Sequence, residues 1–155
     1  MGNVLTAGQG MNPGRQVAIK AGLPVSVPGM ALNRVCGSGV QAVISAAQAV
    51  ALGDGEVILA RGIENMDQAP FLDTKARYGY RMSMPGVELL DHMVYDGLWD
   101  TFNNYHMGLT AENVAEQCGI TREQCNRIAL RSHQNAAAAI QGGLFADQIV
   151  PIAVK

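Results

Sequence analysis

The sequence has few charged and few aromatic side chains. Charged residues make up 15% of the 155 residues and aromatic residues 5%, and 11 basic against 13 acidic side chains give a net charge of −2. The lack of a basic excess argues against a nucleic-acid partner. We find no signal-peptide pattern and no apolar run near the ~18–20 residues of a membrane span, so we expect no membrane partner. Hydrophobic residues, at 48%, suffice for a core and argue against a disordered chain.

Cysteine is also scarce. The three cysteines, Cys36, Cys118 and Cys125, have no metal-binding spacing, so we expect no metal site. An odd number suits a reducing compartment better than a disulfide framework, so we expect a cytoplasmic protein. Cys118 and Cys125 fall at the end of one expected helix and on the next, and we expect both to be packing residues.

Cys36 stands where an expected strand ends and an expected helix begins. Residues 30–35 form an apolar, extended stretch, and from Gly39 to Leu52 apolar residues recur at helical spacing. A thiol at a helix start lies beside unpaired backbone N–H groups and the positive end of the helix dipole, which favour the nucleophilic thiolate. The pattern therefore indicates covalent catalysis. The alternative is a buried structural cysteine, but Gly37 and Gly39 favour the first interpretation because they leave the helix entrance open.

The region around Cys36 predicts a strand–helix–strand unit. The helix is rich in alanine and almost uncharged, so we expect it to be buried on most sides. Residues 57–60 follow it and are typical of a buried parallel strand. Together with residues 30–35 they form a βαβ unit with Cys36 at its turn. A parallel sheet needs neighbouring strands and cover on both faces, so we expect this chain to be a piece of a larger fold.

Other local signals predict further elements. Residues 67–90 form a long irregular segment with a positive character, which is either functional or interfacial, or simply a solvated loop. The remaining expectations are a helix capped by Asn12 and closed by Gly22, a short helix capped by Thr110, a helix over 122–141 begun by a Thr121–Gln124 capping box, and a final strand over 149–154.

Five segments carry motifs in a recognisable order. They are AGQGMNPGRQ at 7–16, NRVCGSG at 33–39, GIENM at 62–66, DGLWD at 96–100 and YHMGLTAENVA at 105–115. Together they make the chain resemble the thiolase family, in particular its acetyl-CoA acetyltransferases, over essentially its full length. The resemblance implies an α/β, thiolase-like fold of βαβ units and a mixed sheet covered by helices. Residues 1–155 would be a partial N-terminal domain of an αβαβα fold, without the opening strands and the C-terminal half.

The resemblance also implies the site residues. Cys36 matches the nucleophile that takes an acyl group from a thioester, with its own backbone N–H contributing to the oxyanion hole. Leu98, His106 and Met107 match positions that line the pantetheine and acyl pocket. The substrate would be acetyl-CoA or another acyl-CoA, with no separate cofactor. A homo-oligomer, either a dimer or a tetramer, is implied, with segment 67–90 mediating tetramer assembly and segment 62–66 near the dimer interface.

The implied activity is that of an acyltransferase of fatty acid metabolism, which forms or cleaves a 3-oxoacyl-CoA such as acetoacetyl-CoA. The family's motifs for the base histidine, the second cysteine and the water-ordering asparagine are not found here, so we expect the chain alone to be inactive. His106 could instead be the base that activates Cys36, but a single loop histidine more often lines a pocket. We expect His92 and His133 to be structural or surface residues.

Two alternatives remain open. One is a non-catalytic, truncated oligomerisation or binding fragment, which would expose apolar surface. The other is a condensing enzyme of the ketoacyl-synthase type, although the motifs at 12–16 and 106–108 favour a thiolase. Whether the chain is itself an enzyme is undecided at this point.

Overall fold

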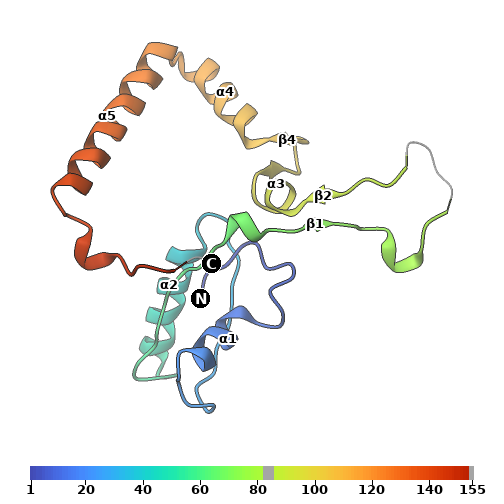
Figure 1. Cartoon of the computed structure of the whole chain (residues 1–155), viewed down its shortest axis with the longest axis vertical. Helices are drawn as coiled ribbons and strands as arrows, with labels where there is room; N and C mark the ends of the chain where they lie inside the picture. The colour runs from blue at the N-terminus through green and yellow to red at the C-terminus, as the bar shows by residue number, and fades with distance from the viewer. Residues whose placement is uncertain (82–85, 154–155) are drawn as a thin grey trace. The chain divides into compact units, whose positions relative to one another are not determined.

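The computed structural model describes residues 1–81 and 86–153 (Figure 1). The chain divides into two compact units, Met1–His106 and Met107–Lys155, which are described separately below. The first unit contains helices α1 (Pro13–Lys20), α2 (Ser38–Leu52) and α3 (His92–Gly97), short 3₁₀ helices η1 (Met66–Gln68) and η2 (Ala76–Tyr78), and strands β1 (Phe71–Leu72), β2 (Leu90–Asp91), β3 (Trp99–Asp100) and β4 (Tyr105–His106). The second unit contains α4 (Met107–Cys118), α5 (Arg122–Gln141) and η3 (Ala146–Gln148).

Three extended segments lie side by side in the first unit. Gly2 forms a parallel bridge to Leu32 on one side and to Gly62 on the other. Four backbone hydrogen bonds of 2.8–3.0 Å join the segments: Asn3 N to Leu32 O, Leu32 N to Met1 O, Gly2 N to Arg61 O and Ile63 N to Gly2 O. The chain therefore runs from Leu32 through α2 to Gly62 as a parallel crossover, as predicted. The segment around Gly2 lies between its two ends.

The predicted strands are much shorter than the sequence suggested. Residues 30–35 pair with the segment around Gly2 only at one bridge, and residues 57–60 belong to no described strand. Val57 is 86% exposed, so the prediction of a buried strand there is wrong. No strand forms over 149–153 either, and Val154 lies outside the described residues. Parallel strands are stabilised by neighbours and by cover on both faces, which the described residues do not supply.

Helix α2 has the predicted bounds but not the predicted burial. It begins after Gly37 and ends at Gly53, whose φ of 80° is the left-handed conformation that commonly closes a helix. Only Ser38 and Ala42 are buried along it, and Leu52 is 79% exposed. The expectation of a helix buried on most sides is therefore wrong for this chain, because the described residues cover only the start of α2.

The segment Val35–Leu52 also has the length and the mean hydropathy, 1.5, of a membrane span. The expectation that no apolar run approaches this length is wrong for this segment. Only 11% of it is buried. The core helix of a soluble fold has the same composition, so this one segment is weak evidence for a membrane span.

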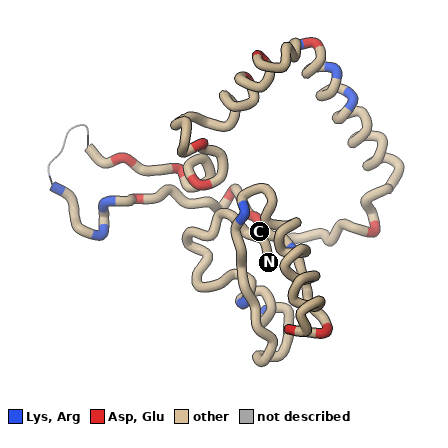
Figure 2. Tube along the Cα trace, turned by 180° about the vertical axis from the view of Figure 1, so that it is seen from behind, with Lys and Arg blue, Asp and Glu red and all other residues tan. Residues whose placement is uncertain are grey.

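Segment 67–90 is a hairpin at its base. Strands β1 and β2 pair antiparallel, with Phe71 opposite Asp91 and Leu72 opposite Leu90. The chain between them extends away from the paired strands (Figure 1), and the basic residues Lys75, Arg77 and Arg81 lie in this outer part (Figure 2). The long irregular segment is thus a hairpin whose outer part projects from the paired strands, and Met82 and Met84 fall outside the described residues. Its role in assembly stays a prediction.

Of the two capping predictions for α4 and α5, the one for Thr110 is wrong and the one for Thr121 and Gln124 is confirmed. Helix α4 begins at Met107, so Thr110 lies inside it and does not cap it. Helix α5 begins at the predicted capping box: Thr121 Oγ1 accepts from Gln124 N at 3.3 Å, and Gln124 Oε1 accepts from Thr121 N at 2.8 Å. The box is a local signal and fixes the helix start without tertiary contacts.

Thr121→Ala should destabilise α5 by about 1 kcal/mol, because the Gln124 amide loses its acceptor. Circular dichroism during thermal unfolding would show the loss as lower helicity. Ser132→Ala, in the middle of the same helix, is the matched control and should leave helicity unchanged or slightly raised. Equal effects of the two substitutions would contradict a capping role for Thr121.

Candidate functional site

Cys36 lies in a tight turn at the start of α2. Gly37 N donates to Arg34 O at 3.1 Å, and Ser38 N donates to Val35 O at 3.0 Å. Gly37 is the N-cap residue and contributes no side-chain cap. The thiol therefore immediately precedes the helix, as the sequence predicts, and the Cys36 side chain is exposed.

The residue before the cysteine has an uncommon backbone conformation. Val35 has a φ of 49°, and a β-branched residue in the left-handed region is a clear outlier. Two side chains hold it there: Asn33 Oδ1 accepts from Val35 N at 2.8 Å, and Ser38 Oγ donates to Val35 O at 2.6 Å. Ser38 Oγ also accepts from Arg34 N at 2.8 Å. Such strain persists where the surroundings over-determine it, and it concentrates at functional sites.

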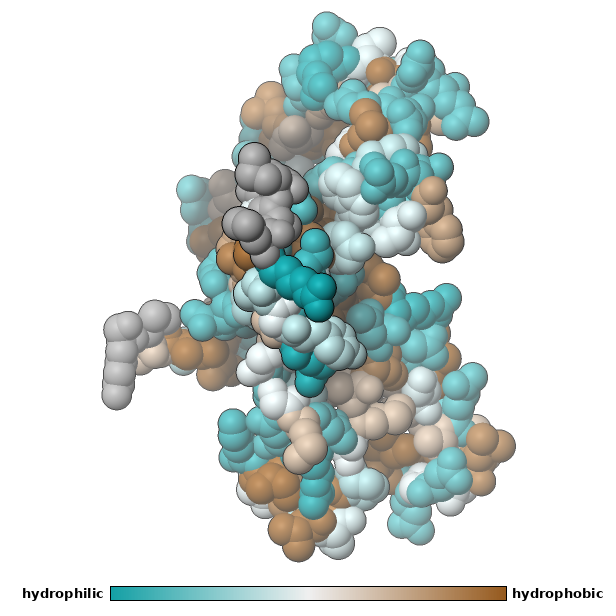
Figure 3. All heavy atoms as spheres, turned by 90° about the vertical axis from the view of Figure 1, so that its right-hand side faces the viewer, coloured by the Kyte–Doolittle hydropathy of each residue, from teal (hydrophilic) through white to brown (hydrophobic). Residues whose placement is uncertain are grey.

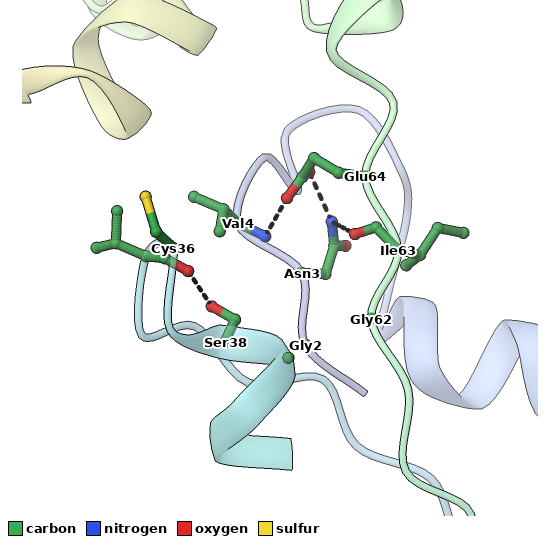
Figure 4. A pocket seen from close by; sticks show the side chains of 10 residues that line it. Gly2, Asn3, Val4, Cys36, Ser38, Gly62, Ile63 and Glu64 are labelled. Atoms are coloured by element: carbon green, nitrogen blue, oxygen red, sulfur yellow. Dashed lines mark hydrogen bonds between the residues drawn. The ribbon is translucent and has the colours of Figure 1, made fainter. Parts of the chain in front are cut away.

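A hollow of about 340 Å³ lies beside Cys36 (Figure 4). Its volume falls within the range of small-molecule sites, about 300–1,000 Å³. The residues lining it come from the turn, from the start of α2 and from the extended segments around Gly2 and Gly62: Gly2, Asn3, Val4, Val35, Cys36, Ser38, Gly39, Gly62, Ile63 and Glu64. The parallel crossover thus brings sequence-distant residues to the exposed thiol.

Glu64 fixes the chain on one side of this hollow. Its carboxylate accepts from Val4 N at 2.9 Å, from Leu5 N at 3.0 Å and from Asn3 Nδ2 at 2.9 Å. Asn3 is 2% exposed, and its Nδ2 also donates to Ile63 O at 3.2 Å. Because the Glu64 oxygens accept these N–H groups, the carboxylate has a structural role.

Sequence reasoning missed the roles of Glu64 and Asn3. It placed segment 62–66 only near an expected dimer interface. The available signal was a carboxylate four positions after the apolar residues 57–60, but its partners lie about sixty positions earlier in the chain. A contact at that separation cannot be read from local pattern.

Gly2 approaches the start of α2 very closely. A Cβ atom on Gly2 would lie 2.5 Å from the Ser38 carbonyl carbon and 2.8 Å from Gly39 N. These are backbone atoms, so they could not move aside as a flexible side chain could. Glycine at this position therefore permits the contact between the Gly2 segment and the turn that carries Cys36.

The residues expected to bind the substrate are not among those lining this hollow. Leu98 is half-buried and follows α3 directly. His106 is exposed at the end of β4, where it pairs with Trp99, and Met107, 46% exposed, begins the second unit. None of the described residues lining the hollow is a histidine, so the structure adds no support for His106 as the base of Cys36. Binding roles for Leu98, His106 and Met107 stay predictions.

The other histidines and cysteines differ in burial. His92 is buried, at 4% exposure, which suits the structural role expected for it, and His133 is exposed on α5. Cys125 is half-buried, but Cys118 is exposed, so the prediction that Cys118 packs is wrong. The described residues contain no group of three or more histidine, cysteine or acidic side chains that could hold a metal ion.

These features define a class, an α/β protein that presents an exposed thiol on a strained turn at the start of a helix. The family follows from comparison. The thiolase N-terminal domain matches residues 1–155, and the chain belongs to the thiolase family. This confirms the resemblance and favours the thiolase prediction over a ketoacyl-synthase-type enzyme.

Individual relatives agree with this assignment. The chain is 58% identical to an acetyl-CoA acetyltransferase of Pseudomonas aeruginosa and 53% identical to one of Syntrophomonas wolfei. Each match covers 99% of this chain and 39% of the relative. A crystal structure of a thiolase from Ascaris suum in complex with coenzyme A superposes with a TM-score of 0.91 at 37% identity, again over 99% of this chain and 39% of that one. The predicted fold class, a partial N-terminal half of a thiolase-like α/β fold, is confirmed.

Gly2→Ala should destabilise the first unit by about 1–3 kcal/mol, because the new methyl group overlaps the Ser38 backbone. Gly39→Ala is the matched control: nothing lies within 4 Å of its Cβ position, and alanine in a helix is favoured over glycine by up to about 1 kcal/mol. Urea unfolding measures both effects. If Gly2→Ala unfolds at the same urea concentration as the parent, the close contact does not exist in solution.

Proposed function

We propose that the chain is the nucleophile-bearing part of an acyl-CoA acyltransferase of the thiolase type. In this proposal Cys36 takes the acyl group of an acyl-CoA, and the whole protein forms or cleaves a 3-oxoacyl-CoA such as acetoacetyl-CoA in fatty acid metabolism. The observation that carries it is the exposed thiol of Cys36 on its strained turn beside an open hollow. The identity of 58% to an acetyl-CoA acetyltransferase supports the choice of substrate.

The acyl transfer itself needs only a thiolate and an oxyanion donor. The Cys36 sulfur attacks the thioester carbonyl carbon, and a carbon–sulfur bond forms as charge moves to the carbonyl oxygen. When the tetrahedral intermediate collapses, the bond to the coenzyme A sulfur breaks and that thiolate leaves. The amides of Gly37 and Ser38 already donate to carbonyls of the turn, so we assign the Cys36 amide as the donor to the oxyanion.

The step that forms or cleaves the carbon–carbon bond needs a base, and the described residues lining the hollow do not supply a histidine for it. The base must remove a proton from the acetyl methyl group. Glu64 is engaged with backbone and side-chain N–H groups. The chain spans 39% of the length of its curated relatives, so we assign the acylation half-reaction to it and the base to the rest of a complete thiolase.

The substrate and the setting of this reaction are part of the same proposal. The relative from Ascaris suum was crystallised with coenzyme A, which supports an acyl-CoA substrate. The proposal assigns Leu98, His106 and Met107 to the lining of the pantetheine and acyl pocket. A homo-oligomer, a dimer or a tetramer, and a cytoplasmic location belong to the same proposal.

Incubation with acetyl-CoA should add a single acetyl group to the chain, attached to Cys36. Mass spectrometry of the intact chain and of its peptides would detect the group and locate it. Cys36→Ser should abolish the modification, whereas Cys118→Ser, which removes another exposed thiol, should leave it unchanged. Acetylation that is equal on Cys36 and Cys118 would mean that the turn confers no special reactivity.

A second candidate function is a non-catalytic oligomerisation fragment, and the apolar surface of the first unit favours it. Apolar residues stand exposed among polar ones (Figure 3). On α2 and residues 57–59, the exposed large apolar side chains are Val40 (65%), Val43 (57%), Ile44 (40%), Val50 (46%), Leu52 (79%), Val57 (86%), Ile58 (38%) and Leu59 (73%). Exposed apolar side chains gathered on one helix and the segment after it are typical of an interaction surface.

The chain alone should therefore self-associate and bind a hydrophobic dye. Light scattering over a concentration series measures the first property, and the fluorescence of the dye measures the second. Val40→Gln combined with Val43→Gln should lower both signals, whereas Lys20→Gln, at the end of α1, should change neither. A monomeric chain that binds no dye would contradict this function.

A further inference from the structure

His92 occupies a buried position between α3 and the segment near the start of the chain. It is the first residue of α3 and is 4% exposed. Its Nδ1 lies 2.5 Å from Asp96 Oδ2, one helical turn further on. Its Nε2 accepts from Ala7 N at 3.3 Å, so one imidazole ring joins two segments that are 85 positions apart.

The two contacts together fix the protonation state of the ring. A backbone N–H can only donate, so Nε2 must offer its lone pair to Ala7. The single proton of the neutral ring then lies on Nδ1 and is donated to the Asp96 carboxylate. Both bonds coexist only in this Nδ1–H form.

The groups around His92 are acidic. His92 N donates to Pro70 O, and α3 packs against β2 and β3. Segments 5–9 and 64–70, α3, β2 and β3 carry no lysine or arginine, and their other titratable groups are Glu64, Asp67, Asp91, Tyr95, Asp96 and Asp100. Glu64 accepts from Asn3, Val4 and Leu5, Asp91 caps α3, and Asp100 accepts from Phe102 and Asn103. Asp96 is therefore the charge that contacts the ring directly.

We propose that His92 is a proton-operated latch that fastens segment 5–9 to α3. When Nε2 takes up a proton, it becomes a donor that faces the Ala7 N–H, and that hydrogen bond is lost. The charged ring keeps its contact with Asp96, now as an ion pair. The latch is closed while the ring is neutral and opens when the ring takes up its second proton.

The latched segment continues directly into the Cys36 hollow. Asn3 and Val4 line the hollow, and Leu5 Cδ2 lies 3.7 Å from the Cβ position of Gly97 at the end of α3. Opening the latch would therefore free the chain at Ala7, next to this wall, while Glu64 still holds Asn3, Val4 and Leu5. This inference stands on the His92 contacts alone and does not depend on the proposed acyl transfer.

Nuclear magnetic resonance of the chain labelled with ¹⁵N, including the histidine rings, tests the latch directly. In its neutral form the His92 ring should show the Nδ1–H tautomer. The protection of the Ala7 amide against hydrogen exchange, corrected for the intrinsic effect of pH, should fall about tenfold as His92 takes up its second proton. An Nε2–H tautomer in the neutral ring, or Ala7 protection that does not change when the ring takes up its second proton, would overturn the proposal.

Two substitutions of His92 test its contacts with Ala7 and Asp96 separately, and a substitution of His133 is the control. His92→Gln places an amide oxygen near the position of Nε2, so Ala7 should stay protected at every pH at which the chain is folded. His92→Asn retains a donor toward Asp96 but no acceptor for Ala7, so protection should be low throughout. His133→Gln removes an exposed histidine of α5 and should preserve the transition. If the Ala7 transition persists in His92→Gln, His92 does not operate it.

Discussion

The contact between Gly2 and the start of α2 is the constraint on which the site depends. The absence of a side chain on Gly2 lets an extended segment lie against the backbone of Ser38. Ser38, buried at this contact, uses one hydroxyl to hold both Arg34 N and Val35 O. The strained conformation of Val35 follows from this clamp, and with it the exposed position of Cys36. Geometry that would be unfavourable in isolation is thus maintained by a few short polar contacts around one turn.

The elements predicted correctly from the sequence are those with local signals. Asn12 and Pro13 begin α1, Gly53 ends α2, and the Thr121–Gln124 box begins α5, because caps act within a few residues of the chain. The position of Cys36 before a helix was found in the same way. Thr110 is not a cap because α4 begins three residues earlier, at Met107, and the Thr110 hydroxyl has no hydrogen-bond partner among the described residues.

The features that sequence reasoning missed depend on distant partners. Glu64 and Asn3 are joined across about sixty positions, and His92 reaches Ala7 across 85. The left-handed Val35 could not be expected, because its residue type disfavours that conformation and only Asn33 and Ser38 impose it. Burial of α2 and of residues 57–60 was overestimated for a related reason. An apolar pattern indicates that a segment can be covered, but the covering partner is not encoded in the segment.

The uncovered face of α2 has a thermodynamic consequence. Leu5 and Ala42 are the buried hydrophobic residues among those described, so little apolar area is removed from water when this chain folds. Anything that binds α2 only in its folded form adds its binding free energy to the stability of the chain. Folding and association would then be one equilibrium, and the midpoint of unfolding would rise with the concentration of the covering partner.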